Sequence, residues 1–585
     1  MLKKALIITT VLAILLSGLA FPISAAKAEG IDYAYSVKGG AVNNVDELLA
    51  ALTSESSGKT YGVYENGVIR LTASIILKKP IEIKNGSYTL YGRGVTVYRG
   101  FSGAAMFYMS SNAETDVGLT LKGGNSTELQ LKINGNSEEF PAESQGMVFM
   151  AGRTNLHAEN VTFTNSSTEA YGGAIYAEIA ETGYERTPLP PEIVLNNCKI
   201  TNCTAYAGGG AIAMNAYYSG TDSGSITLEN VELKGNKSCG ADYYGYGGAI
   251  YSYGGMVELE TVTFDANEAD FGGAIYTCST TEINNCTFTN NKANAYGGAI
   301  HIDRKESVIG SAKLEECTLS YNSSLGNGGA ISNVGSLSIN GTLMIIESNT
   351  AEVNGGGVYN EGSFEMLGGS IMLNRAGHQG GAVYCKDEVA KLTMKSGEMH
   401  SNTAQFCGGL YSGGELVITN GAIGNNNGGF PHILLKGSTS LSETALLNND
   451  SVGICSTVIG EEKVYPYIYL PAKMTATVTV DIAFCDEKLD KDGALKGYKE
   501  ATKGSMRLLD GSDESIESAK QIMKVNSRGA LSYKINSDGT LSVRFLFLPI
   551  WSWVLIITAI AVSGFVFRAK IAWAYKKIFV KKKNS

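Results

Sequence analysis

A short glycine-rich signature that recurs along the chain is the feature that most constrains the fold. The shortest recurrent interval between copies is about 25 residues, as between Gly247 and Gly272. A repeat of this length predicts one supersecondary unit per copy, which cannot bury its own apolar face and must stack on its neighbours. The signature reads Gly-Gly-Ala-Ile-Tyr where it begins at Gly172, Gly247 and Gly272, and variants begin at Gly209, Gly297, Gly328, Gly355, Gly380 and, in degenerate form, Cys407.

A second signature, an apolar residue followed three positions later by asparagine, precedes most of the glycine pairs. Phe288 and Asn291 are one example, and Cys286 stands two residues before Phe288. Val262 and Cys317 hold the position of Cys286 in neighbouring copies. This period of two is typical of a β-strand with one buried face, and a cysteine that exchanges with valine acts as a small buried hydrophobe. We therefore predict an all-β fold, a right-handed parallel β-helix with these positions facing a shared interior.

The asparagines of the second signature are expected at turns, because their side chains hydrogen-bond the backbone and tolerate left-handed dihedral angles. Stacked on their counterparts in neighbouring coils, they are expected to form a structural amide ladder along the axis. The glycine pair supplies a tight turn and a close backbone approach. The predicted ladder comprises Asn267, Asn291, Asn322, Asn349, Asn374 and Asn402.

A tyrosine follows the glycine signature in many copies. If the residue before it faces inward, alternation directs the tyrosine outward, and the rings form a stripe along the axis. Such rings can contact a sugar or a protein ligand, or they can stack on one another and stabilise the fold without any ligand. The sequence leaves both alternatives open. The stripe comprises Tyr176, Tyr251, Tyr276, Tyr359, Tyr384 and Tyr411, with His301 in the same series.

The two signatures together resemble the repeats of chlamydial polymorphic membrane proteins and of glycine-rich adhesin-like proteins of Firmicutes and some archaea. Phe288-Thr289-Asn290-Asn291 and Gly297-Gly298-Ala299-Ile300 carry the resemblance, which covers residues 160–430. It implies a surface protein of the adhesin type. The chlamydial family ends in a translocating outer-membrane domain, whereas this sequence ends in an apolar segment. That difference favours a Gram-positive or archaeal surface.

The two ends of the sequence predict export and membrane anchoring. Residues 1–28 combine Lys3 and Lys4 near the start, an apolar run and a small-x-small site, which is typical of a secretory signal peptide. Residues 545–567 are 23 almost wholly apolar positions, and about 20 suffice to cross a bilayer. Residues 568–585 carry basic residues and no acids, so we expect a cytoplasmic tail behind a single transmembrane helix.

The part of the chain between these ends would then lie outside the cell. An amphipathic segment at residues 45–52 predicts a helix that caps the first coil. We expect three regions: an N-terminal cap at 29–64, β-helix repeats at 65–450, and a membrane-proximal β module or stalk at 451–544.

Composition and motifs favour binding over catalysis. The net charge of -9 argues against a nucleic-acid partner. Metal-binding, nucleophile-elbow and phosphate-loop motifs do not occur, so no metal and no cofactor is predicted. The enzymatic alternative is a membrane-anchored polysaccharide lyase or glycoside hydrolase, which requires paired carboxylates or calcium ligands with a basic proton acceptor. Asp265 and Asp270 share one turn region, but no aspartate cluster recurs in successive copies.

We therefore expect no catalytic residue and a cell-surface adhesin-like or structural binding protein. Its expected partners are the membrane and a host or cell-wall glycan or protein receptor.

Overall fold

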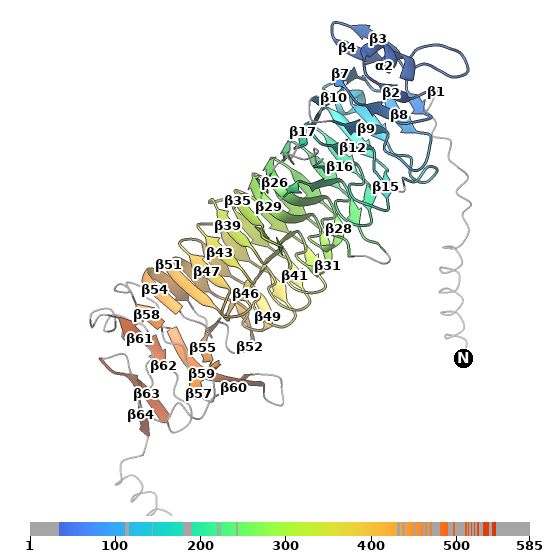
Figure 1. Ribbon diagram of the computed structural model, residues 1–585. Coiled ribbons are helices and arrows are strands. Elements are labelled where there is room, and N and C mark those ends of the chain that lie inside the picture. The colour runs from blue at the N-terminus through green and yellow to red at the C-terminus, as the bar shows by residue number, and fades with distance from the viewer. Residues whose placement is uncertain are drawn as a thin grey trace, which may run out of the picture. The chain divides into compact units, whose positions relative to one another are not determined.

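The computed structural model describes residues 34–111, 116–142, 144–179, 190–218, 221–222, 224–240 and 244–429, and short segments between residues 433 and 545 (Figure 1). The chain divides into two compact units, of which the first comprises Met1–Leu337 and Leu343–Ile345, and the second comprises Ser338–Thr342 and Ile346–Ser585. The predicted signal peptide, the apolar run after Phe545 and the basic tail lie outside the described residues.

In the first unit, each repeat contributes strands that pair in parallel with the equivalent strands one repeat later. Ile250 lies opposite Ile275 in the first such pair, and Phe264 lies opposite Phe288 in the second. The pairs are β26 (Ile250–Glu260) with β29 (Ile275–Asn284), β27 (Thr263–Asp265) with β30 (Thr287–Thr289), and, in a separate sheet, β28 (Glu268–Phe271) with β31 (Lys292–Tyr296).

The second unit repeats this pattern. Strand β46 (Val383–Cys385) pairs in parallel with β50 (Leu410–Ser412), and β47 (Lys391–Met394) pairs with β51 (Glu415–Gly424). The prediction of an all-β fold is confirmed, and a long sheet dominated by parallel pairing is compatible with a parallel β-helix. The handedness of the coils stays a prediction.

Apolar side chains fill the interior at the positions that the alternation predicts. Val262, Cys286 and Cys317 are at most 1% exposed. The rings of Phe264 and Phe288 stack with their centroids 4.5 Å apart and an interplanar angle of 2°. The prediction that these positions face a shared interior is confirmed, and the burial of their apolar surface, worth about 25 cal/mol per Å², stabilises the stack of coils.

Left-handed corners bracket the short middle strand of each repeat. Asn285, which precedes Cys286, has a φ angle of +55°, and Asn290, which precedes Asn291, has a φ angle of +57°. Asparagine adopts this backbone conformation more readily than other residues with a side chain. Leu373 occupies the second corner in a later repeat, with a φ angle of +57°.

Both glycines of the repeated pair are required by the backbone. Gly272 has a φ angle of +66°, which disfavours any residue with a Cβ atom. Gly273 has ordinary dihedral angles, but a Cβ atom there would lie 2.1 Å from the carbonyl oxygen of Gly298 in the next coil. The first glycine therefore makes the turn, and the second allows successive coils to approach closely.

Within residues 34–64, the part of this segment that the structure describes, there is one short helix. Helix α2 (Val45–Ala51) starts after Asn44, whose side chain accepts a hydrogen bond of 2.9 Å from the backbone of Glu47, and it buries Leu48. A helix was predicted here, but its role as a cap stays a prediction. Parallel pairing begins before this helix, because β1 (Tyr35–Val37) pairs with β5 (Ile75–Leu77).

Parallel pairing also extends beyond residue 450, where the sequence signatures end. Strand β55 (Ser451–Cys455) pairs in parallel with β59 (Val480–Leu489), which pairs in parallel with β62 (Met523–Val525). An antiparallel hairpin of β63 (Leu531–Ile535) and β64 (Leu541–Phe545) follows. Within the described part of the chain, no helix has the length and apolar character needed to cross a membrane.

Replacing Leu373 by asparagine is expected to raise the free energy of unfolding by about 1 kcal/mol, because asparagine relieves the cost of the left-handed corner. The side chain is 54% exposed, so little packing is lost. Denaturant titration measures the change. The matched control is Val389→Asn, at a position that is 73% exposed and has no left-handed backbone, and it should be neutral. If Leu373→Asn leaves the free energy of unfolding unchanged or lowers it, the backbone at this corner is not strained by leucine.

Candidate functional site

A ladder of buried asparagines runs through part of the first unit, from Asn236 to Asn322, at the second corner of successive repeats. The Nδ2 atom of Asn267 donates to Oδ1 of Asn291 over 2.9 Å, and the backbone N–H of Asn267 donates to the same oxygen over 3.0 Å. Asn291 repeats both bonds to Asn322, and its Nδ2 atom also donates to the backbone oxygen of Phe264. All three asparagines are at most 1% exposed. Each amide therefore joins neighbouring coils through groups that would otherwise be buried without partners.

The second unit contains the same arrangement. Nδ2 of Asn349 donates to Oδ1 of Asn374 over 2.9 Å, and Asn374 donates in the same way to Asn402 over 3.0 Å. Two further members of these ladders, Asn236 and Asn426, lie outside the predicted set, and they bond to Asn267 and Asn402 respectively. Each of the two follows an apolar residue by three positions, so the signature used for the others could have found them.

The tyrosines of the first unit lie on the outside of the sheet but are covered by further rings. Tyr251 and Tyr276 stack with centroids 5.4 Å apart and are 5% and 4% exposed. Tyr246 packs against both rings, and Phe271 packs against Tyr246. Tyr176 is half-buried, and its hydroxyl donates to Glu178 over 2.8 Å.

The tyrosines of the second unit form a continuous stack. Ring centroids are 5.5 Å apart between Tyr359 and Tyr384, and 4.5 Å apart between Tyr384 and Tyr411. Tyr359 is 4% exposed, whereas the other two are half-buried. Because the ring faces in the stack contact one another, they do not offer a platform on which a sugar can stack.

At Tyr251, Tyr276 and Tyr359 the rings stack on neighbouring rings, as in the alternative in which the stripe stabilises the fold without a ligand. These side chains are buried because neighbouring coils supply rings that cover or stack on them. A ligand contact at Tyr176, Tyr384 or Tyr411 stays a prediction.

Titratable groups gather beside the covered rings. The Tyr276 hydroxyl donates to Oδ2 of Asp303 over 2.5 Å, and Nε2 of His301 lies 3.8 Å from the same oxygen. Burial raises the pKa of Asp303, but this effect is outweighed by the nearby His301 imidazole and by the hydrogen bond from Tyr276, which together lower the pKa to about 2. Burial also raises the pKa of Tyr276 and raises that of Cys278 to about 12.

At neutral pH this cluster holds a carboxylate beside a neutral phenol and a neutral thiol. Cys278 is fully buried and His301 is 4% exposed, so a substrate cannot reach either group. The cluster therefore stabilises the covered ring layer, and its geometry does not fit acid–base or nucleophilic catalysis.

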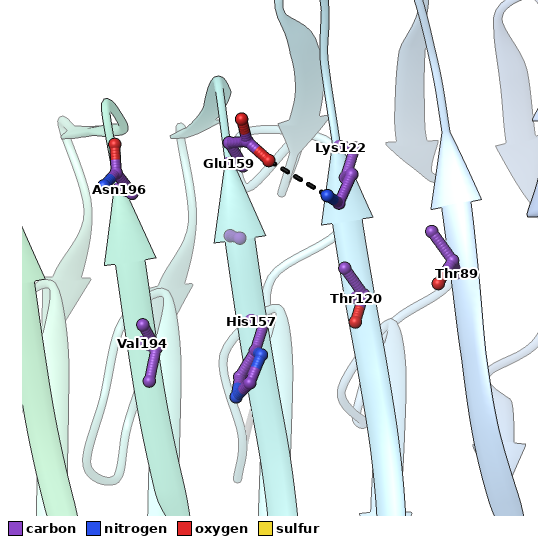
Figure 2. Close-up of a pocket in the computed structure, with 8 residues that line it drawn as sticks. Thr89, Thr120, Lys122, His157, Glu159, Val194 and Asn196 are labelled. Carbon is purple, nitrogen blue, oxygen red and sulfur yellow. Dashed lines mark ion pairs between the residues drawn. The ribbon is translucent and has the colours of Figure 1, made fainter.

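An open groove of about 490 Å³ lies on the outer face of the long sheet near its N-terminal end (Figure 2). Thr89, Thr120, His157 and Val194 form one row across it, in register on adjacent strands. The strands are β7 (Gly86–Tyr91), β10 (Val117–Lys122), β13 (Thr154–Glu159) and β17 (Glu192–Asn196).

A second row of polar side chains runs beside the first. Lys122 forms an ion pair of 3.0 Å with Glu159, as Figure 2 shows, and Asn196 donates to Glu229 over 2.7 Å. Nε2 of His157 lies 3.6 Å from Glu192. The groove thus offers hydroxyl, imidazole, ammonium and carboxylate groups, which exchange hydrogen bonds with the hydroxyls of a sugar or with polar groups of a protein. Among the residues that the structure describes, no cluster of three or more His, Cys, Asp or Glu could hold a metal ion.

Comparisons with known proteins give two matches. Residues 285–303 and 316–334 match the model of the Chlamydia polymorphic membrane protein repeat. Over 350 residues the chain is 26% identical to a probable outer membrane protein, pmp6, of Chlamydia pneumoniae, and the alignment covers 54% of this chain and 24% of that protein. The chain thus spans about a quarter of the length of this relative. It is similar to polymorphic membrane proteins through a β-rich repeat, and neither match supports a Gram-positive or archaeal placement.

Replacing Asn291 by alanine is expected to lower the free energy of unfolding by about 3 kcal/mol, because buried polar groups of Asn267 and Asn322 lose their partners. Chemical denaturation of the full chain measures the effect. Asn294→Ala is the control, since Asn294 is exposed and bonds only at the surface. Equal stability of the two variants would contradict a structural role for the ladder.

Replacing Asp303 by asparagine is expected to lower the free energy of unfolding by about 1–2 kcal/mol at pH 7. The pKa of this carboxyl is lowered on folding, so its contribution is complete above pH 4 or so and is lost as the pH falls through about 2. Stability measured from pH 7 to pH 2 should show the two proteins converging below about pH 4. A difference that stays constant over this range, or one matched by the exposed Asp116→Asn, would be inconsistent with this explanation.

Proposed function

We propose that the chain is a non-enzymatic, adhesin-like protein of the cell surface that binds a partner on the outer faces of its sheets. The observation that carries the proposal is the similarity of its repeat to that of polymorphic membrane proteins. The relative that aligns over 350 residues is described as a probable outer membrane protein. This description supports a location in the cell envelope for this chain too.

The difference between inward and outward residues of each repeat supports the proposal. Inward residues such as Phe264 and Ile275 are fully buried, so they serve packing alone. Many outward residues of the long sheet are polar, and they change identity from repeat to repeat while the glycines and asparagines recur. Binding specificity therefore belongs to the outer face, and the groove at Thr120 and His157 is the surface that we assign to the partner.

A glycan or a polar protein segment fits this groove best. Its rows place hydrogen-bonding side chains on adjacent strands, which lie about 4.8 Å apart. The ion pair of Lys122 with Glu159 contributes one charge of each sign. The groove lacks large aromatic side chains among its lining residues, so hydrogen bonding rather than stacking would hold the ligand.

The groove is tested by screening the full chain against glycans and candidate protein receptors, alongside assays for reducing sugar and unsaturated uronate. Thr120→Arg should abolish binding with an unchanged melting temperature, because the longer side chain fills the groove. Val389→Arg, at an exposed site on the second unit, should leave binding intact. Binding that survives Thr120→Arg would exclude the groove, and turnover abolished by replacing one carboxylate would replace the proposal with the polysaccharide-cleaving alternative.

We further propose that residues 545–567 anchor the protein as a single transmembrane helix with residues 568–585 in the cytoplasm. The support is the apolar character of the first segment and the basic character of the second. Deletion of residues 546–585 should release the protein into the medium, as immunoblots of medium and membrane fractions would reveal. Retention of the truncated protein on cells would refute this anchor.

A further inference from the structure

A buried arginine in the first unit has no counter-charge among the residues that the structure describes. Arg99 ends β8 (Thr96–Arg99), and its side chain points into the interior, where it is 0% exposed. Its neighbour on the preceding coil is Leu77, which is also fully buried. One guanidinium nitrogen, Nη2, donates to the backbone oxygen of Gly146. The other two, Nε and Nη1, have no hydrogen-bond partner among the described residues.

The positive charge persists inside the coil. Burial lowers the pKa of Arg99 to about 10, which still leaves the guanidinium protonated at pH 7. The titratable group that interacts with it is the thiol of Cys203, and burial raises the pKa of that thiol to about 12. Cys203 is therefore neutral and does not balance the charge. A buried ion without a counter-ion is strongly unfavourable, so an anion is needed nearby.

A further unsatisfied donor lies two coils along, at the end of the asparagine ladder. Asn236 accepts from the backbone of Cys203, and in the preceding coil Ser166 holds the ladder position. The hydroxyl of Ser166 is 1% exposed and has no partner within the described residues. The ladder thus ends at an unused hydroxyl instead of an amide.

Gly135 brings the serine and the arginine into the same part of the interior. It follows Asn134, which lies opposite Tyr98, so Gly135 stands beside Arg99 in the next coil. A Cβ atom on Gly135 would lie 2.6 Å from the Cβ atom of Ser166. Because glycine has no side chain, no side chain from this position can pair with the guanidinium or with the hydroxyl.

We propose that this interior position binds a small monovalent anion of the chloride class, held by Nε and Nη1 of Arg99 and by the hydroxyl of Ser166. All three groups donate hydrogen bonds, and the anion supplies both the acceptor and the missing negative charge. A water molecule would satisfy the donors but leave the charge unbalanced. The anion closes the N-terminal end of the amide ladder, where the sequence changes from asparagine to cysteine and serine.

The test is thermal unfolding of the full chain at constant ionic strength, with chloride or bromide replacing gluconate. The melting temperature of the wild-type protein should rise by a few degrees for each tenfold increase in halide above the dissociation constant. Ser166→Ala should weaken this dependence several-fold, and Arg99→Met should abolish it. The control Arg153→Met removes an exposed arginine and should keep the full dependence.

A melting temperature of the wild-type protein that is the same in gluconate and in halide would overturn the proposal. Equal halide dependence in Ser166→Ala and wild type would do so as well, and this variant keeps the test valid if Arg99→Met does not fold. Bromide diffraction from crystals provides the direct readout, with an anomalous peak expected within about 3.5 Å of Arg99 Nε or Nη1. An anomalous map without that peak, from protein that shows halide dependence, would place the anion elsewhere and refute this site.

Discussion

The buried amide ladder is the interaction on which the repeats depend. Each asparagine, such as Asn291, uses its carbonyl oxygen to accept two bonds from one neighbouring coil, and its Nδ2 atom donates to groups on both sides. The coil corner would otherwise bury backbone N–H groups without partners, at a cost of about 1–3 kcal/mol each. The ladder therefore fixes the register of successive coils within each unit, and the left-handed corner before each asparagine directs its side chain inward.

This constraint separates the residues that build the fold from those that are available for binding. The glycine pair, the asparagine and the inward apolar residues must recur, because each satisfies a requirement of the backbone or the interior. The outer face has no such requirement, and its rows differ along the sheet, from Thr120 and His157 to Glu258 and Glu282. The similarity to polymorphic membrane proteins rests on the recurring part, and the residues of the outer face contribute little to it.

The repeat and its inward residues could be predicted from the sequence because they obey local rules. Alternation identified the buried positions of Val262 and Cys286, and the spacing of asparagine after an apolar residue pointed to the corner. The burial of Tyr251 and Tyr276 could not be predicted this way, since Tyr246, which packs against both rings, precedes the glycine pair and lies outside the alternating strand. Likewise, parallel pairing beyond residue 450 carries no signature, and the burial of Arg99 contradicts the usual exposure of charged residues. Both depend on neighbours one or more coils away.

The most direct test of the account is a double-mutant cycle between two adjacent members of the ladder, Asn267→Ala and Asn291→Ala, with unfolding followed in denaturant. The account predicts that the two effects are not additive, with a coupling free energy of about 1–3 kcal/mol, because each amide is the partner of the other. Effects that add within about 0.5 kcal/mol would show that the two amides act independently and that the coils are held in register by other contacts.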